Sequence, residues 1–124
     1  MAKCFLSVCS FLGFLSVALG AFAAHALKQK FSDYQLSVFN TGVQYQFFHA
    51  FALGLVGVLL LKNGEAPLLK AAGYAFGLGV AVFSGSLYLL AFTQIKWLGA
   101  ITPIGGVSFL VGWVLLGLSI VKYL

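Results

Sequence analysis

The chain has 124 residues, of which 62% are hydrophobic and 7% are charged, and its formal net charge is +5. A soluble globule of this size needs more polar surface than this composition supplies, so the mean hydropathy of +1.08 indicates an integral membrane protein. The lysines are scattered singly or in pairs between apolar runs, which is typical of helix ends at lipid headgroups and unlike a basic patch that binds nucleic acid.

The first apolar run predicts a transmembrane helix over residues 4–24. Its basic start and the Ala-Phe-Ala sequence at 21–23 also resemble a cleaved secretory signal, but the remaining chain would still be mostly apolar, so we favour an uncleaved helix. Cys4 and Cys9 face different directions on a helix, and we interpret them as small packing residues. A stripe of small residues favours close packing with another helix and consists of Ser16, Gly20 and Ala24.

The second span follows the most polar part of the chain, residues 28–40, where Ser32 or Asp33 can cap a helix. Apolar residues at helical spacing in this part predict an amphipathic interfacial segment that continues into a span over residues 41–61. We therefore expect one helix from about Asp33 to the end of that span, closed by the turn sequence Lys-Asn-Gly-Glu at 62–65.

The third span is predicted over residues 67–92 and the fourth over residues 98–122. Within the fourth, Pro103 predicts either a kink or a late helix start. These spans nearly exhaust the chain, which predicts a single transmembrane domain over residues 1–124, an all-α integral membrane four-helix bundle. The clearest helix-packing signal is a row of small residues at every fourth position of the third span: Gly73, Gly77, Ala81 and Gly85.

An even number of spans places both termini on the same side of the membrane as the connection between the second and third spans. That side carries the four lysines Lys3, Lys62, Lys70 and Lys122. The other side carries three, which are Lys28, Lys30 and Lys96. The small excess favours cytoplasmic termini by the positive-inside rule.

Several segments carry a family resemblance in order along the chain: GAFAAHALK at 20–28, TGVQYQFFHAFAL at 41–53, and SGSLYLLAF, WLGAITPIGG and FLVGW between Ser84 and Trp113. They resemble the YgdD and YwdK type of small bacterial inner-membrane proteins, a family without an assigned function that also has a eukaryotic transmembrane relative. The resemblance implies a four-span inner-membrane protein and supplies no catalytic residue. Ala23 and Phe51 stand where the pattern predicts glycine and alanine or leucine, and the polar positions are intact.

Polar side chains within the predicted spans are expected to converge on one half of the bundle. At 100° per residue, Thr41, Tyr45 and His49 form one stripe. His49 lies two turns beyond Thr41, deep enough in the membrane to be a candidate functional group. The predicted polar cluster consists of His25, Thr41, Gln44, Tyr45, Gln46, His49, Ser84, Ser86, Tyr88 and Thr102.

A structural network of interhelical hydrogen bonds, worth about 1 kcal/mol each, is the interpretation we favour for this cluster. A pocket for a small polar ligand, ion or lipid headgroup is the alternative. Haem ligation by His25 and His49 is weaker, because the two differ in depth. The carboxylates Asp33 and Glu65 fall on opposite membrane sides, so we expect no enzyme activity, catalytic residue, cofactor or metal site.

Two function classes follow from the sequence. The first is an accessory or scaffold protein of the bacterial inner membrane that uses its small-residue faces and the segment 32–40 to join partners or to oligomerise. The alternative is a transporter or channel component for a small solute, ion or lipid that acts as an oligomer, although the apolar stretch 56–61 argues against a static pore. Expected partners are membrane lipids, a second copy of the chain or another membrane protein, and no nucleic acid.

Overall fold

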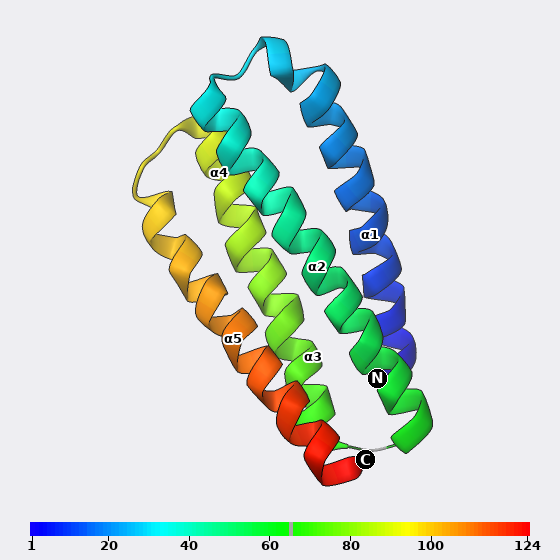
Figure 1. The fold of residues 1–124 in the computed structure, drawn as a ribbon. Helices are drawn as coiled ribbons and strands as arrows, with labels where there is room; N and C mark the ends of the chain where they lie inside the picture. Colours follow the sequence, from blue (N-terminus) through cyan, green and yellow to red (C-terminus); the bar gives the residue numbers. More distant parts are fainter. Residues whose placement is uncertain (65) are drawn as a thin grey trace.

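The computed structural model describes residues 1–64 and 66–124, so Glu65, assigned above to a turn, lies outside the described residues. Within these, four helices are long and apolar enough to cross a membrane, which confirms the predicted all-α membrane architecture. Each predicted span lies inside one of them, and Figure 1 shows them antiparallel, with both termini at one end. They are α1 (Ala2–His25), α2 (Asp33–Asn63), the continuous stretch of α3 (Pro67–Gly79), η2 (Val80–Ser84) and α4 (Gly85–Thr93), and α5 (Leu98–Tyr123).

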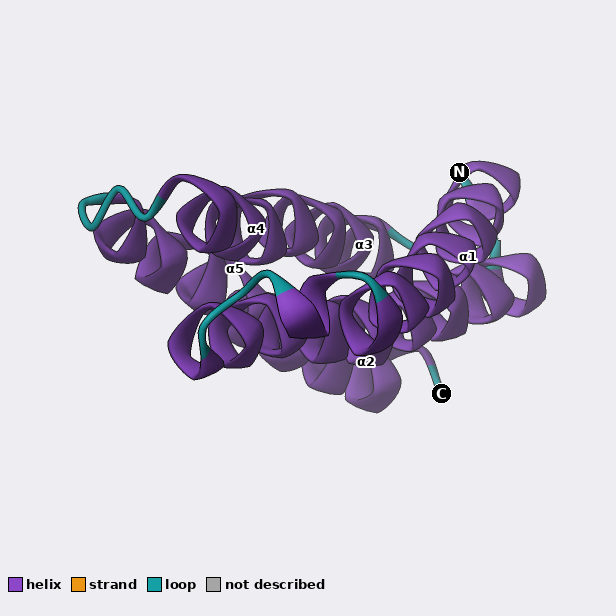
Figure 2. Cartoon of the chain, turned by 90° about the horizontal axis from the view of Figure 1, so that it is seen from above, coloured by secondary structure: helices purple, strands orange, loops and turns teal. Residues whose placement is uncertain are grey.

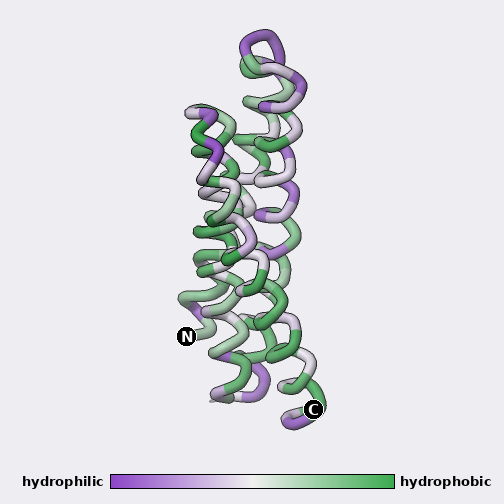
Figure 3. The backbone as a smooth tube through the Cα atoms, turned by 90° about the vertical axis from the view of Figure 1, so that its left-hand side faces the viewer, coloured by the Kyte–Doolittle hydropathy of each residue, from purple (hydrophilic) through white to green (hydrophobic). Residues whose placement is uncertain are grey.

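The helices are predominantly apolar along their length, and hydrophilic segments lie at both ends of the bundle (Figure 3). The shortest of the four has 24 residues, about 36 Å at 1.5 Å per residue, which exceeds the roughly 30 Å of a bilayer's hydrocarbon core. A short 3₁₀ turn, η1 (Leu27–Gln29), connects α1 to α2. The η2 segment is a π-helical turn inside the third span, a local widening that often marks functional or strained helix positions.

The polar start of α2 is fixed by a capping box. The Ser32 hydroxyl accepts from the Gln35 backbone N–H at 3.2 Å, and the Gln35 side-chain oxygen accepts from the Ser32 N–H at 3.0 Å. The Gln35 amide also donates to the Ala91 carbonyl of α4 at 2.8 Å. Phe39, on the same turns, is 1% exposed and packs against Phe92. The segment predicted to be amphipathic therefore buries its apolar side within the protein, against the end of α4.

The fourth span begins at Leu98, so the alternative of a late helix start at Pro103 is wrong. Pro103 lies inside α5 and lacks the N–H that would bond the Gly99 carbonyl, but packing holds the turns before it in place. Leu98 is buried against Leu87 and Leu90 of α4. The first turns of α5 are thus secured by a neighbouring helix and the proline is accommodated within them.

Phenylalanines of one helix lie directly against glycines of the other where α5 packs on α3 and η2. The pairs, here called the Phe–Gly ladder, are Phe76 with Gly112, Phe109 with Gly79, and Phe83 with Gly105. A Cβ atom added at Gly112 would come within 2.7 Å of the Phe76 ring, and one at Gly105 would overlap the backbone of Phe83. Only glycine permits this close approach of the two helices.

The first helix lies at the edge of the bundle, as Figure 2 shows from above. Only 11% of its most apolar window is buried, against 50% for the window of the third span. It packs mainly on α2, where Ser16 is 2% exposed and a Cβ at Gly20 would meet Val43 at 3.6 Å. Ala24, the third member of the predicted stripe, is exposed. The core therefore consists of α2, the third span and α5, with α1 added on one side.

The predicted row of small residues in the third span makes a close helix contact only at Gly73, where a Cβ would overlap the Phe5 ring of α1. Nothing lies within 4 Å of a Cβ at Gly77 or at Gly85, and Ala81 is exposed. The physical reason is the path of α1, which touches α3 near its own N-terminus and then follows α2. The expected packing face is thus mostly turned towards the membrane, and the Phe–Gly ladder takes its place.

The Phe–Gly ladder predicts an unequal response to the same substitution at two glycines of α5. Gly105→Ala should lower the free energy of unfolding by about 1–3 kcal/mol, because the group in the way is the backbone of Phe83 and cannot rotate aside. Gly117→Ala should be neutral or slightly stabilising, since nothing lies within 4 Å of its Cβ. Thermal unfolding in detergent measures both. Equal losses of stability at the two positions would contradict the ladder.

Candidate functional site

The side chain of Gln46 joins three helices at a buried point. Its amide donates to the Leu12 carbonyl of α1 at 3.0 Å, and its side-chain oxygen accepts from the Tyr88 hydroxyl of α4 at 2.7 Å. The Ser16 hydroxyl donates to the same Leu12 carbonyl at 2.8 Å. Gln46 is 3% exposed, and the hydrocarbon offers no water to replace these partners. The Gln46 node therefore ties α1 and α4 to α2.

The imidazole of His49 makes a second tie, between α2 and α5. Its Nδ1 lies 2.8 Å from the Tyr45 carbonyl oxygen, and because a carbonyl only accepts, Nδ1 carries the hydrogen. The lone pair of Nε2 then accepts from the Trp113 indole N–H at 3.0 Å. The ring also stacks on Phe109, with centroids 3.6 Å apart and planes 12° apart. His49 is thus a neutral imidazole with both nitrogens engaged.

Hydroxyl groups make two further interhelical contacts. The Ser84 hydroxyl donates to the Gly42 carbonyl of α2 at 2.7 Å, and Ser84 is 1% exposed. The hydroxyls of Ser86 and Thr102 lie 2.6 Å apart and share a hydrogen bond between α4 and α5. Each of these serines therefore bonds to an oxygen of a neighbouring helix.

Three of the predicted polar residues take no part in these contacts. The Thr41 hydroxyl donates to the Ser37 carbonyl of its own helix at 2.9 Å, and Gln44 and His25 are exposed. His25 lies at the end of α1, while His49 lies near the middle of α2 with both nitrogens occupied, so the two do not form a pair of axial haem ligands. The expected single cluster is divided by its partners, because Gln46 bonds to α1 and α4 whereas His49 bonds to α5.

The sequence reasoning missed the aromatic partners of His49. Phe109 and Trp113 are four residues apart on α5, which places them on the same side of that helix. That spacing was visible in the sequence, but its partner helix was not. Tyr45, one turn before His49, stacks its ring nearly parallel to the imidazole, at 8° and 6.0 Å. Tyr45 is 40% exposed and its hydroxyl has no hydrogen-bond partner within the described residues.

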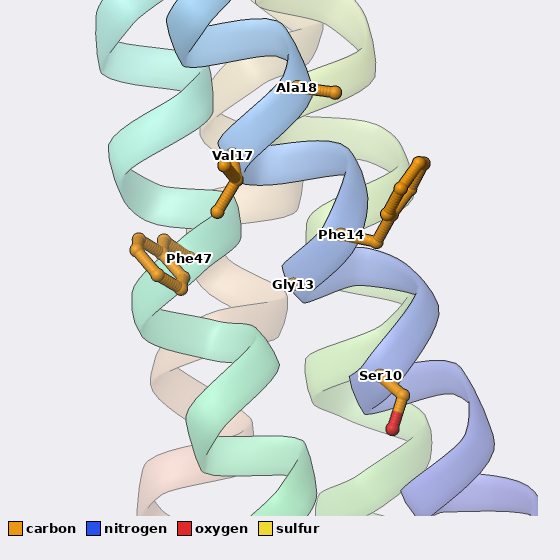
Figure 4. Close-up of a pocket in the computed structure, with 6 residues that line it drawn as sticks. All are labelled: Ser10, Gly13, Phe14, Val17, Ala18 and Phe47. Atoms are coloured by element: carbon orange, nitrogen blue, oxygen red, sulfur yellow. The ribbon is translucent and has the colours of Figure 1, made fainter.

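A hollow of about 570 Å³ lies beside α1 on its membrane-facing side. Gly13 forms its base, because it has no side chain and nothing lies within 4 Å of a Cβ there. Figure 4 shows Phe14 projecting from α1 beside this glycine, and Phe47 reaching the hollow from α2. Phe14 is 71% exposed. A hollow and a protruding ring thus stand next to each other on one face of the protein.

The Gln46 node predicts a coupling between Gln46 and Tyr88. Removing the hydrogen bond by Tyr88→Phe, by Gln46→Leu or by both should give an interaction free energy of about 1 kcal/mol in a double-mutant cycle, the size measured for such bonds in membrane helices. The matched control is Tyr34→Phe with Gln46→Leu. Tyr34 is 61% exposed, so the free-energy changes of these two substitutions should simply add. An additive result for Gln46 and Tyr88 would show that the bond contributes nothing.

The tie between α2 and α5 predicts the tautomer of His49. Nitrogen NMR on protein labelled at histidine should show a neutral ring at pH 7 with the hydrogen on Nδ1, because Nδ1 donates to a carbonyl and Nε2 accepts from Trp113. Trp113→Phe removes the donor and should shift the Nε2 signal of His49, while the nitrogen signals of His25 should not change. A hydrogen on Nε2 in the unsubstituted protein would disprove this geometry.

Comparison with known proteins gives a consistent result along the chain. Residues 19–106 match the model of a family described as a protein of unknown function, DUF423. The chain is 44% identical over 122 residues to the UPF0382 membrane protein YwdK of Bacillus subtilis, which covers 98% of this chain and 99% of that protein. A UPF0382 membrane protein of Haemophilus influenzae is 40% identical over 114 residues, 92% of this chain and 90% of its own length. No solved structure matches the chain.

Proposed function

Because this chain belongs to the DUF423 or UPF0382 family of membrane proteins, as its motifs predicted, and no role is assigned to that family, we propose that it is an accessory or scaffold protein that works by assembly in the membrane. The proposal rests on the exposure of one face of α1. This helix is mostly exposed, and it contributes little to the core of its own chain. A helix that its own bundle leaves uncovered is available to other transmembrane helices.

The partner that this face fits is a second copy of the chain. A two-fold interface brings the same patch of both protomers together, so the patch must hold both a protrusion and a hollow. The α1 face holds Phe14 as the protrusion and the space over Gly13 as the hollow. In the proposed dimer, the Phe14 ring of each protomer lies over Gly13 of the other. Close packing of a large side chain against glycine is how membrane helices associate without a hydrophobic driving force.

The apolar interior of the half of the bundle beyond His49 favours assembly over transport. Below His49 the interior is closed hydrocarbon, since Leu53, Val56 and Phe76 are at most 1% exposed. The buried polar groups above them bond one another or the backbone, and a continuous polar route would have to break those bonds. Catalysis is likewise no part of the proposal, because the sequence holds only the carboxylates Asp33 and Glu65, both outside the apolar spans.

The proposed location is the bacterial inner membrane, with both termini in the cytoplasm. The relatives in Bacillus subtilis and Haemophilus influenzae are named membrane proteins. The end of the bundle that carries the termini has four lysines and the opposite end has three. The positive-inside rule assigns the more basic end to the cytoplasm.

The proposed dimer predicts crosslinking at one membrane-facing position and not at another. In a chain carrying Cys4→Ala and Cys9→Ala, the single cysteine of Ala18→Cys should be joined to that of a second chain by a short bifunctional maleimide, because Ala18 borders the hollow in Figure 4. The matched control is Val114→Cys on α5, which is 61% exposed but faces away from α1. The reaction is carried out in membranes and dimers are counted on denaturing gels.

Two further substitutions separate specific packing from random collision. Phe14→Ala removes the protrusion and Gly13→Leu fills the hollow, so each should reduce crosslinking at position 18 by severalfold. Gly117→Leu adds the same bulk where nothing lies within 4 Å of a Cβ and should leave it unchanged. Equal yields at positions 18 and 114, or no response to Phe14→Ala and Gly13→Leu, would overturn the proposal.

A further inference from the structure

A groove opens to the membrane between α2 and α5, away from the α1 face. Its volume is about 450 Å³, within the range of small-molecule sites. It exists because α5 packs on α3 and η2, while its contact with α2 depends on the side chains of His49, Phe109 and Trp113. The residues that line it are Tyr45, His49, Phe83, Pro103, Gly106, Val107, Phe109, Leu110 and Trp113.

Aromatic side chains line one side of this groove. The rings of Tyr45, His49 and Phe109 are nearly parallel, with interplanar angles of 8° between the first two, 12° between the last two and 17° between the outer two. Gly106 adds no side chain on the α5 side, and a Cβ there would only just touch Phe83, at 3.9 Å. His49 and Phe109 are only 6% and 4% exposed because they stack on each other, so the rings that face the open slot include those of Tyr45 and Trp113, which are 40% and 46% exposed. An open slot beside exposed aromatic rings favours a planar guest.

The groove also carries one free polar group. The hydrogen-bonding groups of His49 and Trp113 are used in their mutual bond and in the bond to the Tyr45 carbonyl. The Tyr45 hydroxyl, in contrast, has no partner within the described residues. In hydrocarbon an unpaired hydroxyl is unfavourable, so a guest that offers it an acceptor gains free energy. The guest that fits is planar and apolar, with a hydrogen-bond acceptor at its edge.

We propose that this groove binds the ring of a prenylated quinone. A quinone ring is planar, its carbonyl oxygens are acceptors without donors, and its isoprenoid tail keeps it in the membrane. The Tyr45 hydroxyl donates to one carbonyl, the quinone ring lies in the slot beside the exposed indole of Trp113, and the tail leaves through the open side into the bilayer. No charged side chain lines the groove, so a phospholipid headgroup finds no partner there. The proposal concerns binding alone and does not depend on the proposed assembly through α1.

The experiment uses Trp113 as a reporter inside the groove. The chain has two tryptophans, and Trp97→Phe leaves Trp113 as the single fluorophore. Titration of the detergent-solubilised variant with a benzoquinone carrying one isoprenyl unit should give saturable quenching, because bound quinone contacts the indole. The opposite variant, Trp113→Phe, reports Trp97 in the loop before α5 and should show only linear quenching from quinone dissolved in the micelle.

Two matched pairs of substitutions in the Trp97→Phe background test the binding geometry. Tyr45→Phe keeps the ring but removes the donor and should weaken binding roughly five- to tenfold, while Tyr34→Phe, at an exposed site on the same helix, should not. Gly106→Leu fills the groove and should abolish saturation. Gly117→Leu adds the same side chain outside the groove, so the saturable quenching should remain. Size-exclusion chromatography checks that each variant is folded.

Three outcomes would overturn the proposal. Linear quenching that is equal for Trp97 and Trp113 would mean that quinone only partitions into the micelle. Saturable quenching that Gly106→Leu leaves intact would place the quinone elsewhere. Saturation that Gly106→Leu abolishes but Tyr45→Phe does not weaken, and that a free fatty acid displaces equally well, would assign the groove to acyl chains. Saturation lost in Gly106→Leu and weakened in Tyr45→Phe supports the quinone site.

Discussion

The close approach of α5 to α3 and η2 is the constraint on which the rest of the structure depends. Lipid tails are as apolar as the side chains of these helices, so burial alone does not hold helices together in a bilayer. The Phe–Gly ladder supplies the attraction instead, because each phenylalanine packs into the space that the opposite glycine leaves. Helix α2 packs on the helices that the ladder joins, and α1 packs mainly on α2.

The polar side chains act in this frame mainly as ties between helices. Gln46 connects α2 to α1 and α4, and His49 connects α2 to α5 through Trp113. These bonds use up the hydrogen-bonding capacity of the deepest polar residues, including both nitrogens of the histidine. Depth in the membrane is therefore a poor guide to reactivity here. The Tyr45 hydroxyl, which lies at the membrane-facing rim, has no protein partner within the described residues.

Two features of the surface follow from how the helices are held. The first helix is tied to the bundle chiefly through α2, so its outer face keeps both the hollow at Gly13 and the ring of Phe14 exposed. The fourth span packs on α3 and η2 through the ladder, and beside the groove it meets α2 through the side chains of His49 and Trp113. This arrangement leaves the groove lined by Tyr45 and Phe109. The α1 face suits a protein partner, and the groove suits a planar guest dissolved in the membrane.

The sequence by itself determined the four spans, because twenty-residue apolar runs separated by short polar turns have one stable form in a bilayer. It also located the start of α2, since Ser32 or Asp33 was expected to cap the helix and Ser32 does so. It identified only one packing glycine of the regular row, Gly73, because nothing lies close to Gly77 or Gly85. The close contacts of α5 fall instead at Gly105 and Gly112. Which glycine is covered depends on which helix lies opposite, and only the tertiary structure decides that. The same holds for His49, whose spacing placed it in the membrane but whose chemistry was settled by Trp113, 64 residues away in the chain.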